Sequence, residues 1–154
     1  SIVRSDGENV DEYVVESEKE KVDVIKVGED LELPEPTVYG FGGNKEWFEE
    51  FEKLENKLSK DLKLRYSGAL VGDVNQVLHY GGVFGYPAKN SAPEGKLRLQ
   101  FEAAPIGFIF ETMADGYSTD GSGRLTNLEP KELHQRVPVF VGNREMVRRI
   151  EDTI

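Results

Sequence analysis

The feature that most constrains the fold of this chain is the alternation of short apolar runs with longer amphipathic stretches. The runs at 37–42, 83–87 and 138–142 have the length and composition of buried strands. Between the first two, residues 45–58 place apolar side chains one, three and three positions apart, which is the spacing of one helix face. Strands interleaved with helices form a sheet that helices cover. The sequence therefore predicts a three-layer αβα fold with a mixed sheet.

Other segments fit the same architecture, and 154 residues are enough for a single domain with its own core. Asn44 is a plausible N-cap for the first helix. Pro105 falls inside the third predicted helix and should kink it, because proline removes one backbone hydrogen bond. The further helices are expected at 68–80, 97–113 and 143–154, and the further strands at 12–15, 22–27 and 117–120.

The charge of the chain is distributed unevenly. Its net charge is −10, and residues 1–61 contain eight Lys and Arg against 18 Asp and Glu, whereas residues 63–98 contain five against two. The acidic balance argues against a nucleic-acid partner, and the local positive excess suggests a small anionic ligand. No apolar run is long enough to cross a membrane, and the lack of cysteine is compatible with a reducing cytoplasm, where we expect the protein to act.

Tyrosines and cations gather at the predicted ends of strands and starts of helices. Arg65 and Tyr66 precede a helix, Tyr86 ends a strand, and Lys96 and Arg98 open the next helix. Backbone N–H groups and the helix dipole favour anions at such positions, and these side chains add direct donors. The alternative is that they are ordinary surface cations with no common ligand.

Glu102 follows Arg98 by four residues, so the two should be neighbours on one helix face. An exposed pair of this kind contributes only tenths of a kcal/mol. The apolar residues beside Glu102 suggest instead a setting in which a carboxylate needs a partner or a metal. One carboxylate cannot hold Mg²⁺ by itself, so further ligands would have to come from elsewhere. The STDGSG segment at 118–123 is better explained as a β-turn than as a phosphate or metal motif.

Three segments, RYSGALVGDVNQVLHYGGVFGYPA, PEGKLRLQFEAAP and ELHQRVPVFVG, together resemble the C-terminal half of fructose-1,6-bisphosphatase in order and spacing. The match is strong over 64–142 and looser over 12–63. Sedoheptulose-1,7-bisphosphatase shares much of the same frame, but GGVFGYPA followed by GKLRL favours the fructose enzyme.

The resemblance implies the fold of the sugar phosphatases and a Mg²⁺-dependent hydrolysis of the 1-phosphate of fructose 1,6-bisphosphate in gluconeogenesis. Because family enzymes are homo-oligomers, usually tetramers, the resemblance also implies a homo-oligomer. In such an assembly Arg65 would reach the 6-phosphate of a neighbouring subunit. The implied roles are 6-phosphate and sugar binding for Tyr66, Tyr86 and Lys96, the neighbouring 6-phosphate for Arg65, the reactive phosphate for Arg98, and a metal ligand for Glu102.

Two departures from the family pattern affect the sugar site. The YGFGGN turn is one residue shorter than in the family, which leaves Asn44 as a weak candidate for phosphate binding, and Ala69-Leu70 replaces a Ser-Met pair. The family's metal cluster and catalytic loop belong to an N-terminal half, so no catalytic residue is expected in residues 1–154. We expect this chain to need its own N-terminal domain and to be inactive alone. The alternatives are a sedoheptulose or related sugar phosphatase, or a non-catalytic sugar-phosphate-binding module.

Overall fold

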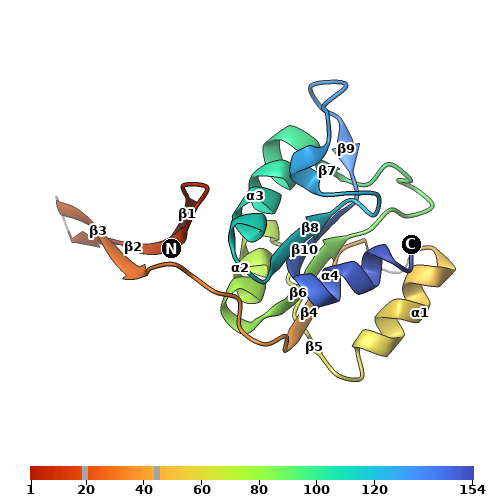
Figure 1. Cartoon of the computed structure of the whole chain (residues 1–154), viewed down its shortest axis with the longest axis horizontal. Helices are drawn as coiled ribbons and strands as arrows, with labels where there is room; N and C mark the ends of the chain where they lie inside the picture. The colour runs from red at the N-terminus through yellow and green to blue at the C-terminus, as the bar shows by residue number, and fades with distance from the viewer. Residues whose placement is uncertain (19–20, 44–45) are drawn as a thin grey trace.

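The computed structural model describes residues 1–18, 21–43 and 46–154. A five-stranded mixed sheet in the order β5-β4-β6-β10-β8 forms its centre (Figure 1). Strand β4 runs parallel to both β5 and β6, whereas β10 runs antiparallel to both β6 and β8. The mixed sheet is therefore confirmed. The strand bounds are β4 (Val38–Phe41), β5 (Lys63–Leu64), β6 (Gly82–Tyr86), β8 (Gly116–Thr119) and β10 (Val139–Asn143).

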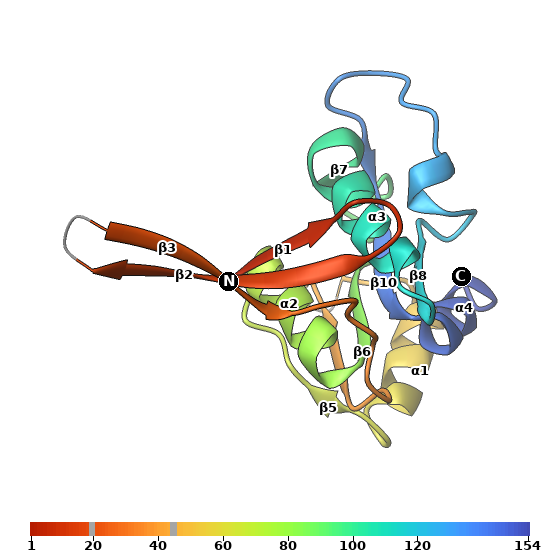
Figure 2. The same cartoon turned by 60° about the vertical axis from the view of Figure 1, so that its left-hand side comes forward.

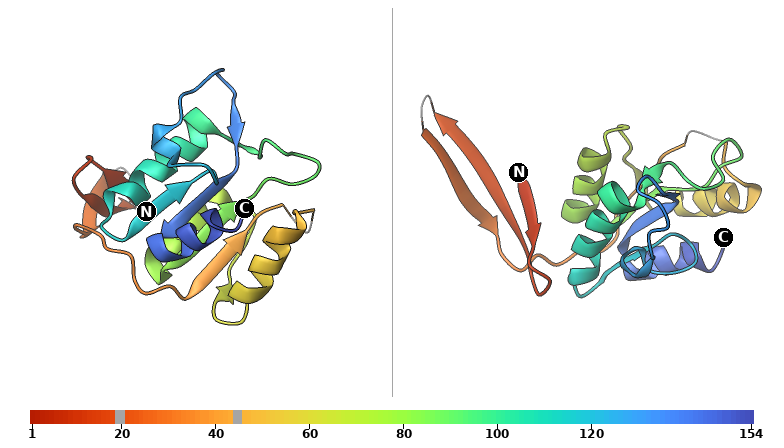
Figure 3. Two further views of the ribbon diagram at one scale, coloured as in Figure 1. Left: turned by 45° about the vertical axis from the view of Figure 1, so that its right-hand side comes forward. Right: turned by 90° about the horizontal axis from the view of Figure 1, so that it is seen from above.

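Helices cover both faces of this sheet, which gives the predicted α/β layers (Figure 3). Neighbouring residues of a strand point to opposite faces, so each strand serves two cores. In β10, Val139 and Val141 pack with α2 and α3, whereas Phe140 packs with α1 and α4. The helix bounds are α1 (Glu49–Leu58), α2 (Leu70–Tyr80), α3 (Ala104–Thr112) and α4 (Arg144–Glu151).

A second, antiparallel sheet of β1 (Ile2–Ser5), β2 (Val10–Glu18) and β3 (Lys21–Gly28) precedes this body. The hairpin of β2 and β3, here called the arm, projects away from the body in both views (Figures 1 and 2). Its root is attached, because Val10 is buried in the α2/α3 core and the hydroxyls of Ser5 and Thr112 lie 2.9 Å apart.

The predicted helix at 97–113 is wrong in its first part. Leu97–Arg98 is a short strand, β7, paired with β9 (Arg136–Val137), and Leu99–Ala103 forms a π-helical turn before α3. Pro105 is the second residue of α3 and follows the π-helical turn, in which the Ala104 amide donates to the Leu99 carbonyl. It therefore lies where the π-helical turn passes into α3, not in the middle of a regular α-helix. The apolar periodicity correctly indicates helical structure from Leu99 onward, but pairing with β9 makes Leu97–Arg98 a strand.

The other predicted elements are present with shifted ends. The first helix begins at Glu49 rather than near residue 45, and Asn44 lies outside the described residues. No strand was predicted at β1, β5 or β9, which contain four, two and two residues. None of the helices in the described part of the chain is long and apolar enough to cross a membrane.

Candidate functional site

Tyr66, Tyr86 and Lys96 line one small cavity of about 130 Å³ at the end of β6. They come from three separate segments: Tyr66 from the connection between β5 and α2, Tyr86 from the last position of β6, and Lys96 from the residue before β7. The Lys96 Nζ donates to the Tyr86 hydroxyl at 3.2 Å and lies 5.3 Å from the centroid of the same ring. The structure thus brings together the three residues that the sequence suggested for sugar and 6-phosphate binding.

Gly42 makes this arrangement possible. A Cβ atom at this position would lie 2.2 Å from Cε2 of Tyr86, so a side chain would collide with the ring. The Gly42 amide also donates to the Gly85 carbonyl at 2.9 Å, which holds the turn after β4 against β6. Sequence analysis noted the glycines of this turn only as a departure from the family pattern, because the contact with Tyr86 joins residues 44 positions apart.

The Tyr66 hydroxyl remains a hydrogen-bond donor at neutral pH. Burial raises the pKa of Tyr66, and the nearby Tyr86 and Asp73 raise it further, while Lys96 acts in the opposite direction. A protonated phenol can donate to a phosphate oxygen, and the Lys96 ammonium supplies up to three more donors. The cavity therefore presents neutral and cationic donors to one small anion.

Arg98 and Glu102 form a second cluster in which a carboxylate is tightly held. The Glu102 Oε2 accepts hydrogen bonds from the Arg98 backbone amide at 2.8 Å and from its Nε at 3.1 Å. Burial alone would raise the pKa of Glu102, but these two hydrogen bonds and the charges of Arg98 and Arg136 hold it below its ordinary value. The pair does not lie along one helix face as predicted, because Arg98 ends β7 and Glu102 caps the turn that follows.

Glu102 has the chemistry of one Mg²⁺ ligand. Both of its hydrogen bonds engage Oε2, so in the described part of the chain Oε1 has no hydrogen-bond partner. An ionised carboxylate oxygen is a ligand that Mg²⁺ prefers. Residues 1–18, 21–43 and 46–154 contain no group of three or more His, Cys, Asp or Glu that could hold a metal ion. Glu102 therefore fits a metal site that takes its other ligands from outside these residues.

The remaining candidate residues lie apart from the cavity. Arg65 is exposed and does not line it; its backbone amide donates to the Tyr39 carbonyl at 2.8 Å, and its Nη1 donates to the Leu64 carbonyl at 3.3 Å. Asn44 falls outside the described residues, so no geometry relates it to Tyr86.

Sequence analysis missed two residues that support the site. Arg136 donates through Nη1 to the backbone carbonyl of Lys96 and contributes positive charge near Glu102. Asp73 lines the same cavity as Tyr66 and is almost completely buried. Arg136 belongs to the HQRVPV segment used for the resemblance, so its place there was the available signal.

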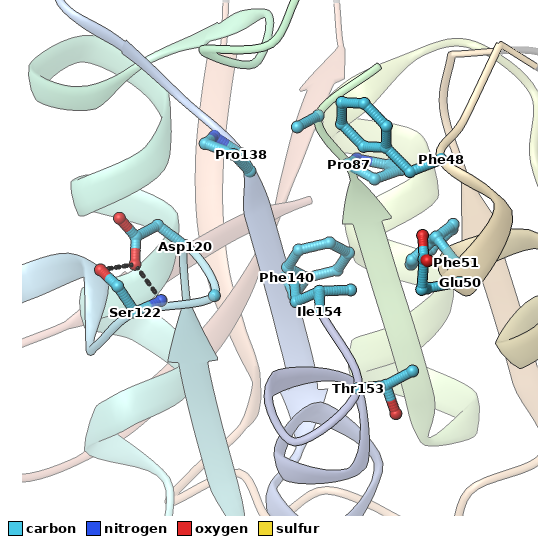
Figure 4. Close-up of a pocket in the computed structure, with 12 residues that line it drawn as sticks. Phe48, Glu50, Phe51, Pro87, Asp120, Ser122, Pro138, Phe140, Thr153 and Ile154 are labelled. Atoms are coloured by element: carbon cyan, nitrogen blue, oxygen red, sulfur yellow. Dashed lines mark hydrogen bonds between the residues drawn. The ribbon is translucent and has the colours of Figure 1, made fainter. Parts of the chain in front are cut away.

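A larger cavity of about 430 Å³ lies between α1, β10 and the end of the chain and contains none of these candidate residues (Figure 4). Its lining is mostly apolar, with Phe48, Phe140 and Ile154 prominent. The Asp120 Oδ1 at its edge already accepts the amide and hydroxyl of Ser122, both at 2.8 Å. These bonds belong to a side-chain-stabilised bend that follows β8, in which Gly121 has φ +103°. The larger cavity therefore offers fewer hydrogen-bond donors to an anion than the small cavity does.

Comparison with known proteins agrees with this geometry. Residues 33–154 match the family described as "Fructose-1-6-bisphosphatase, C-terminal domain". The chain belongs to the fructose-1,6-bisphosphatase family. The resemblance found in the sequence is therefore confirmed, and the family domain begins after the N-terminal sheet.

Individual members of the fructose-1,6-bisphosphatase family show how far the similarity extends. The chain is 48% identical over 155 residues to a class 1 enzyme of Haloarcula marismortui, covering 99% of this chain and 51% of that protein. It is 40% identical over 132 residues to the chloroplastic enzyme of Pisum sativum, covering 80% and 32%.

The fold is similar to the T-state crystal structure of Leishmania major fructose-1,6-bisphosphatase, with a TM-score of 0.88 and 29% identity, over 98% of this chain and 48% of that one. The chain thus spans about half the length of the Haloarcula marismortui and Leishmania major proteins and about a third of the Pisum sativum protein.

Proposed function

We propose that the full-length protein is a Mg²⁺-dependent fructose-1,6-bisphosphatase, and that residues 1–154 are its sugar- and 6-phosphate-binding half. The observation that supports this most directly is the meeting of Tyr66, Tyr86 and Lys96 in one small cavity of a chain with net charge −10. Such donors at a strand end suit a phosphate. A cytoplasmic location, a role in gluconeogenesis and assembly into homo-oligomers, with Arg65 reaching a neighbouring subunit's 6-phosphate, belong to the same proposal.

In this proposal the candidate residues bind the substrate, orient it or hold the metal. The two tyrosine hydroxyls and the Lys96 ammonium bind the 6-phosphate and so fix the sugar, while the Arg98 guanidinium faces the reactive phosphate. Glu102 supplies one ligand to Mg²⁺, which when bound activates water and stabilises charge on the phosphate that is hydrolysed. The hydrogen bonds from Arg98 keep the Glu102 carboxylate ionised and oriented for this contact.

The N-terminal half of the same protein is the partner we propose for the arm. Val22 and Val24 are 63% and 59% exposed on one side of β3, and Ile25 is 42% exposed on the other. Isolated two-stranded hairpins are marginal in water, and such apolar exposure is typical of an interface. The arm also lies outside the matched C-terminal domain, in a chain half the length of its relatives. Backbone amides of the arm should exchange with deuterium much more slowly in the full-length protein than in this chain.

The activity itself is tested by phosphate release from fructose 1,6-bisphosphate with added Mg²⁺. We expect turnover by the full-length protein and none by residues 1–154 alone. Turnover by this chain alone would contradict the divided site. Comparing the rates of hydrolysis of fructose 1,6-bisphosphate and sedoheptulose 1,7-bisphosphate separates the two bisphosphatases. A full-length protein that binds fructose 6-phosphate but hydrolyses neither substrate would be a binding module.

The binding site is tested by calorimetric titration of this chain with fructose 6-phosphate. Lys96→Ala should weaken binding about tenfold or more, because a charge-assisted hydrogen bond to phosphate is lost. Lys89→Ala is the matched control, since Lys89 pairs with Glu46 at 3.0 Å and does not line the cavity. Equal affinities of the two variants would remove Lys96 from the site.

A further inference from the structure

Asp73 is a buried carboxylate that lines the small cavity and whose side-chain oxygens accept hydrogen bonds from the turn at 67–68. It lies in the first turn of α2 and is only 3% exposed. Its Oδ1 accepts the Ser67 amide at 2.7 Å and the Ser67 hydroxyl at 2.8 Å, and its Oδ2 accepts the Gly68 amide at 3.0 Å. A buried carboxylate is stable only with such partners, so Asp73 and the turn at 67–68 fix each other.

The turn that Asp73 holds directly follows Tyr66. Upstream, the Arg65 amide is tied to the Tyr39 carbonyl on β4 at 2.8 Å, and a side chain at Gly40 would collide with the Arg65 carbonyl. Downstream, Gly68 has φ +85°, a conformation that favours glycine and that its bond to Asp73 maintains. The short segment that carries Tyr66 is thus anchored at both ends, to β4 and to Asp73.

We propose that Asp73 is a positioning residue for sugar-phosphate binding, which acts by holding the 67–68 turn so that Tyr66 faces Tyr86 and Lys96. This inference rests on the proposed function of the cavity. Electrostatics alone gives the opposite expectation: Asp73 lines the same cavity, and its negative charge opposes a phosphate there. Removing the charge therefore strengthens phosphate binding if Asp73 acts only through its field, and weakens binding if Asp73 positions Tyr66.

The test uses the full-length protein with the substitution Asp73→Asn, which keeps the shape but replaces an acceptor with a donor. We expect KM for fructose 1,6-bisphosphate to rise about tenfold while kcat changes less than about twofold, since a lost positioning contact affects binding. Glu111→Gln is the matched control, because Glu111 also accepts two side-chain hydroxyls, from Ser118 and Thr126, and does not line the cavity. Its KM should stay unchanged.

A second variant keeps the inference testable if Asp73→Asn fails to fold. Ser67→Ala removes the hydrogen bond from the Ser67 hydroxyl to Asp73 and the one that this hydroxyl accepts from the Ala69 amide at 3.2 Å, but it keeps both amide bonds to Asp73. It should raise KM by a smaller factor, about threefold. An unchanged or lower KM in every one of these two variants that folds, or an equal rise in Glu111→Gln, would overturn the positioning role.

Hydrogen exchange needs no substrate, so it tests the role of Asp73 independently of the proposed function. Hydrogen exchange at the Ser67 and Gly68 amides should become faster in Asp73→Asn and stay the same in Glu111→Gln. If the wild-type protein hydrolyses no bisphosphate, the proposed function fails, while faster exchange still shows that Asp73 holds the turn. Unchanged exchange would contradict the inference itself, whatever the activity.

Discussion

The same residue type has opposite surroundings in the arm and in the body of this molecule. Val24 on β3 is 59% exposed, whereas Val141 on β10 is completely buried between two layers of helices. Both lie in hydrogen-bonded strands: Val24 is paired with Val15 of β2 on one side, and Val141 is paired with Phe84 of β6 and Ser118 of β8. The difference shows that ladder hydrogen bonds define a strand and that only packing on its faces makes it part of a core. The body has its own core, whereas the arm exposes apolar side chains that the proposed interface with an N-terminal half would cover.

The largest test of this comparison is Phe140→Ala in the body. Phe140 is completely buried and packs in the α1/α4 core, so its loss should lower the free energy of unfolding by about 3–5 kcal/mol. Phe108 is 45% exposed, so Phe108→Ala is the control and should cost less than about 1 kcal/mol. Urea unfolding followed by circular dichroism measures both. Equal losses would mean that the burial of Phe140 in the α1/α4 core adds no stability beyond that of an exposed position.

The junction between the two regions is tested by Asn143→Ala. The Asn143 side chain accepts the Gly82 amide at 2.6 Å and donates to the Pro34 carbonyl at 3.0 Å, which ties the connecting segment to the sheet. Its removal leaves a buried amide unpaired and should destabilise the chain by about 2 kcal/mol. Asn56→Ala, at an exposed position of α1, is the control and should have almost no effect. A small loss for Asn143→Ala would show that the junction contributes little to the body.

The comparison becomes sharper with two matched valine substitutions. In this chain, Val141→Ala should cost about 1.5–2 kcal/mol, because two buried methyl groups are lost, whereas Val24→Ala should cost less than about 0.5 kcal/mol. In the full-length protein the cost of Val24→Ala should rise toward that of Val141→Ala if the N-terminal half covers the arm. A cost that stays small in the full-length protein would contradict the proposed interface.

The smallest effect is expected at the ion pairs of the arm. The hydrogen bond from Lys26 is the main reason that the pKa of Asp11 is lowered, and the two atoms lie 2.8 Å apart. A lowered pKa means that the stabilisation is present above the ordinary Asp range and is lost as the pH falls through the lowered value. In Lys26→Ala the pKa of Asp11 should rise toward 3.8, as measured by NMR titration. An unchanged titration midpoint would show that this pair is not formed in solution.

Much of the body could be predicted because its signals are local. The spacing of Phe51 and Leu54 predicts α1, and the glycines at 81–82 correctly mark the end of α2. Tyr66, Tyr86 and Lys96 were singled out together with Arg65 and Arg98, because all five lie near predicted strand ends or helix starts, and the family resemblance implied their roles. Of these five residues, Tyr66, Tyr86 and Lys96 line the small cavity, and Arg65 and Arg98 do not.

The sequence by itself determined the α/β class, the order of the main strands and helices, and the family of the chain, because periodicity and motif spacing depend on neighbouring residues. Only the tertiary structure decided that Leu97–Arg98 is a strand, that Tyr86 lies over Gly42, and that Asp73 holds the turn after Tyr66. It also decided that the apolar arm lies outside the core. These features depend on contacts between segments far apart in the sequence, and such contacts exist only once the layers have packed.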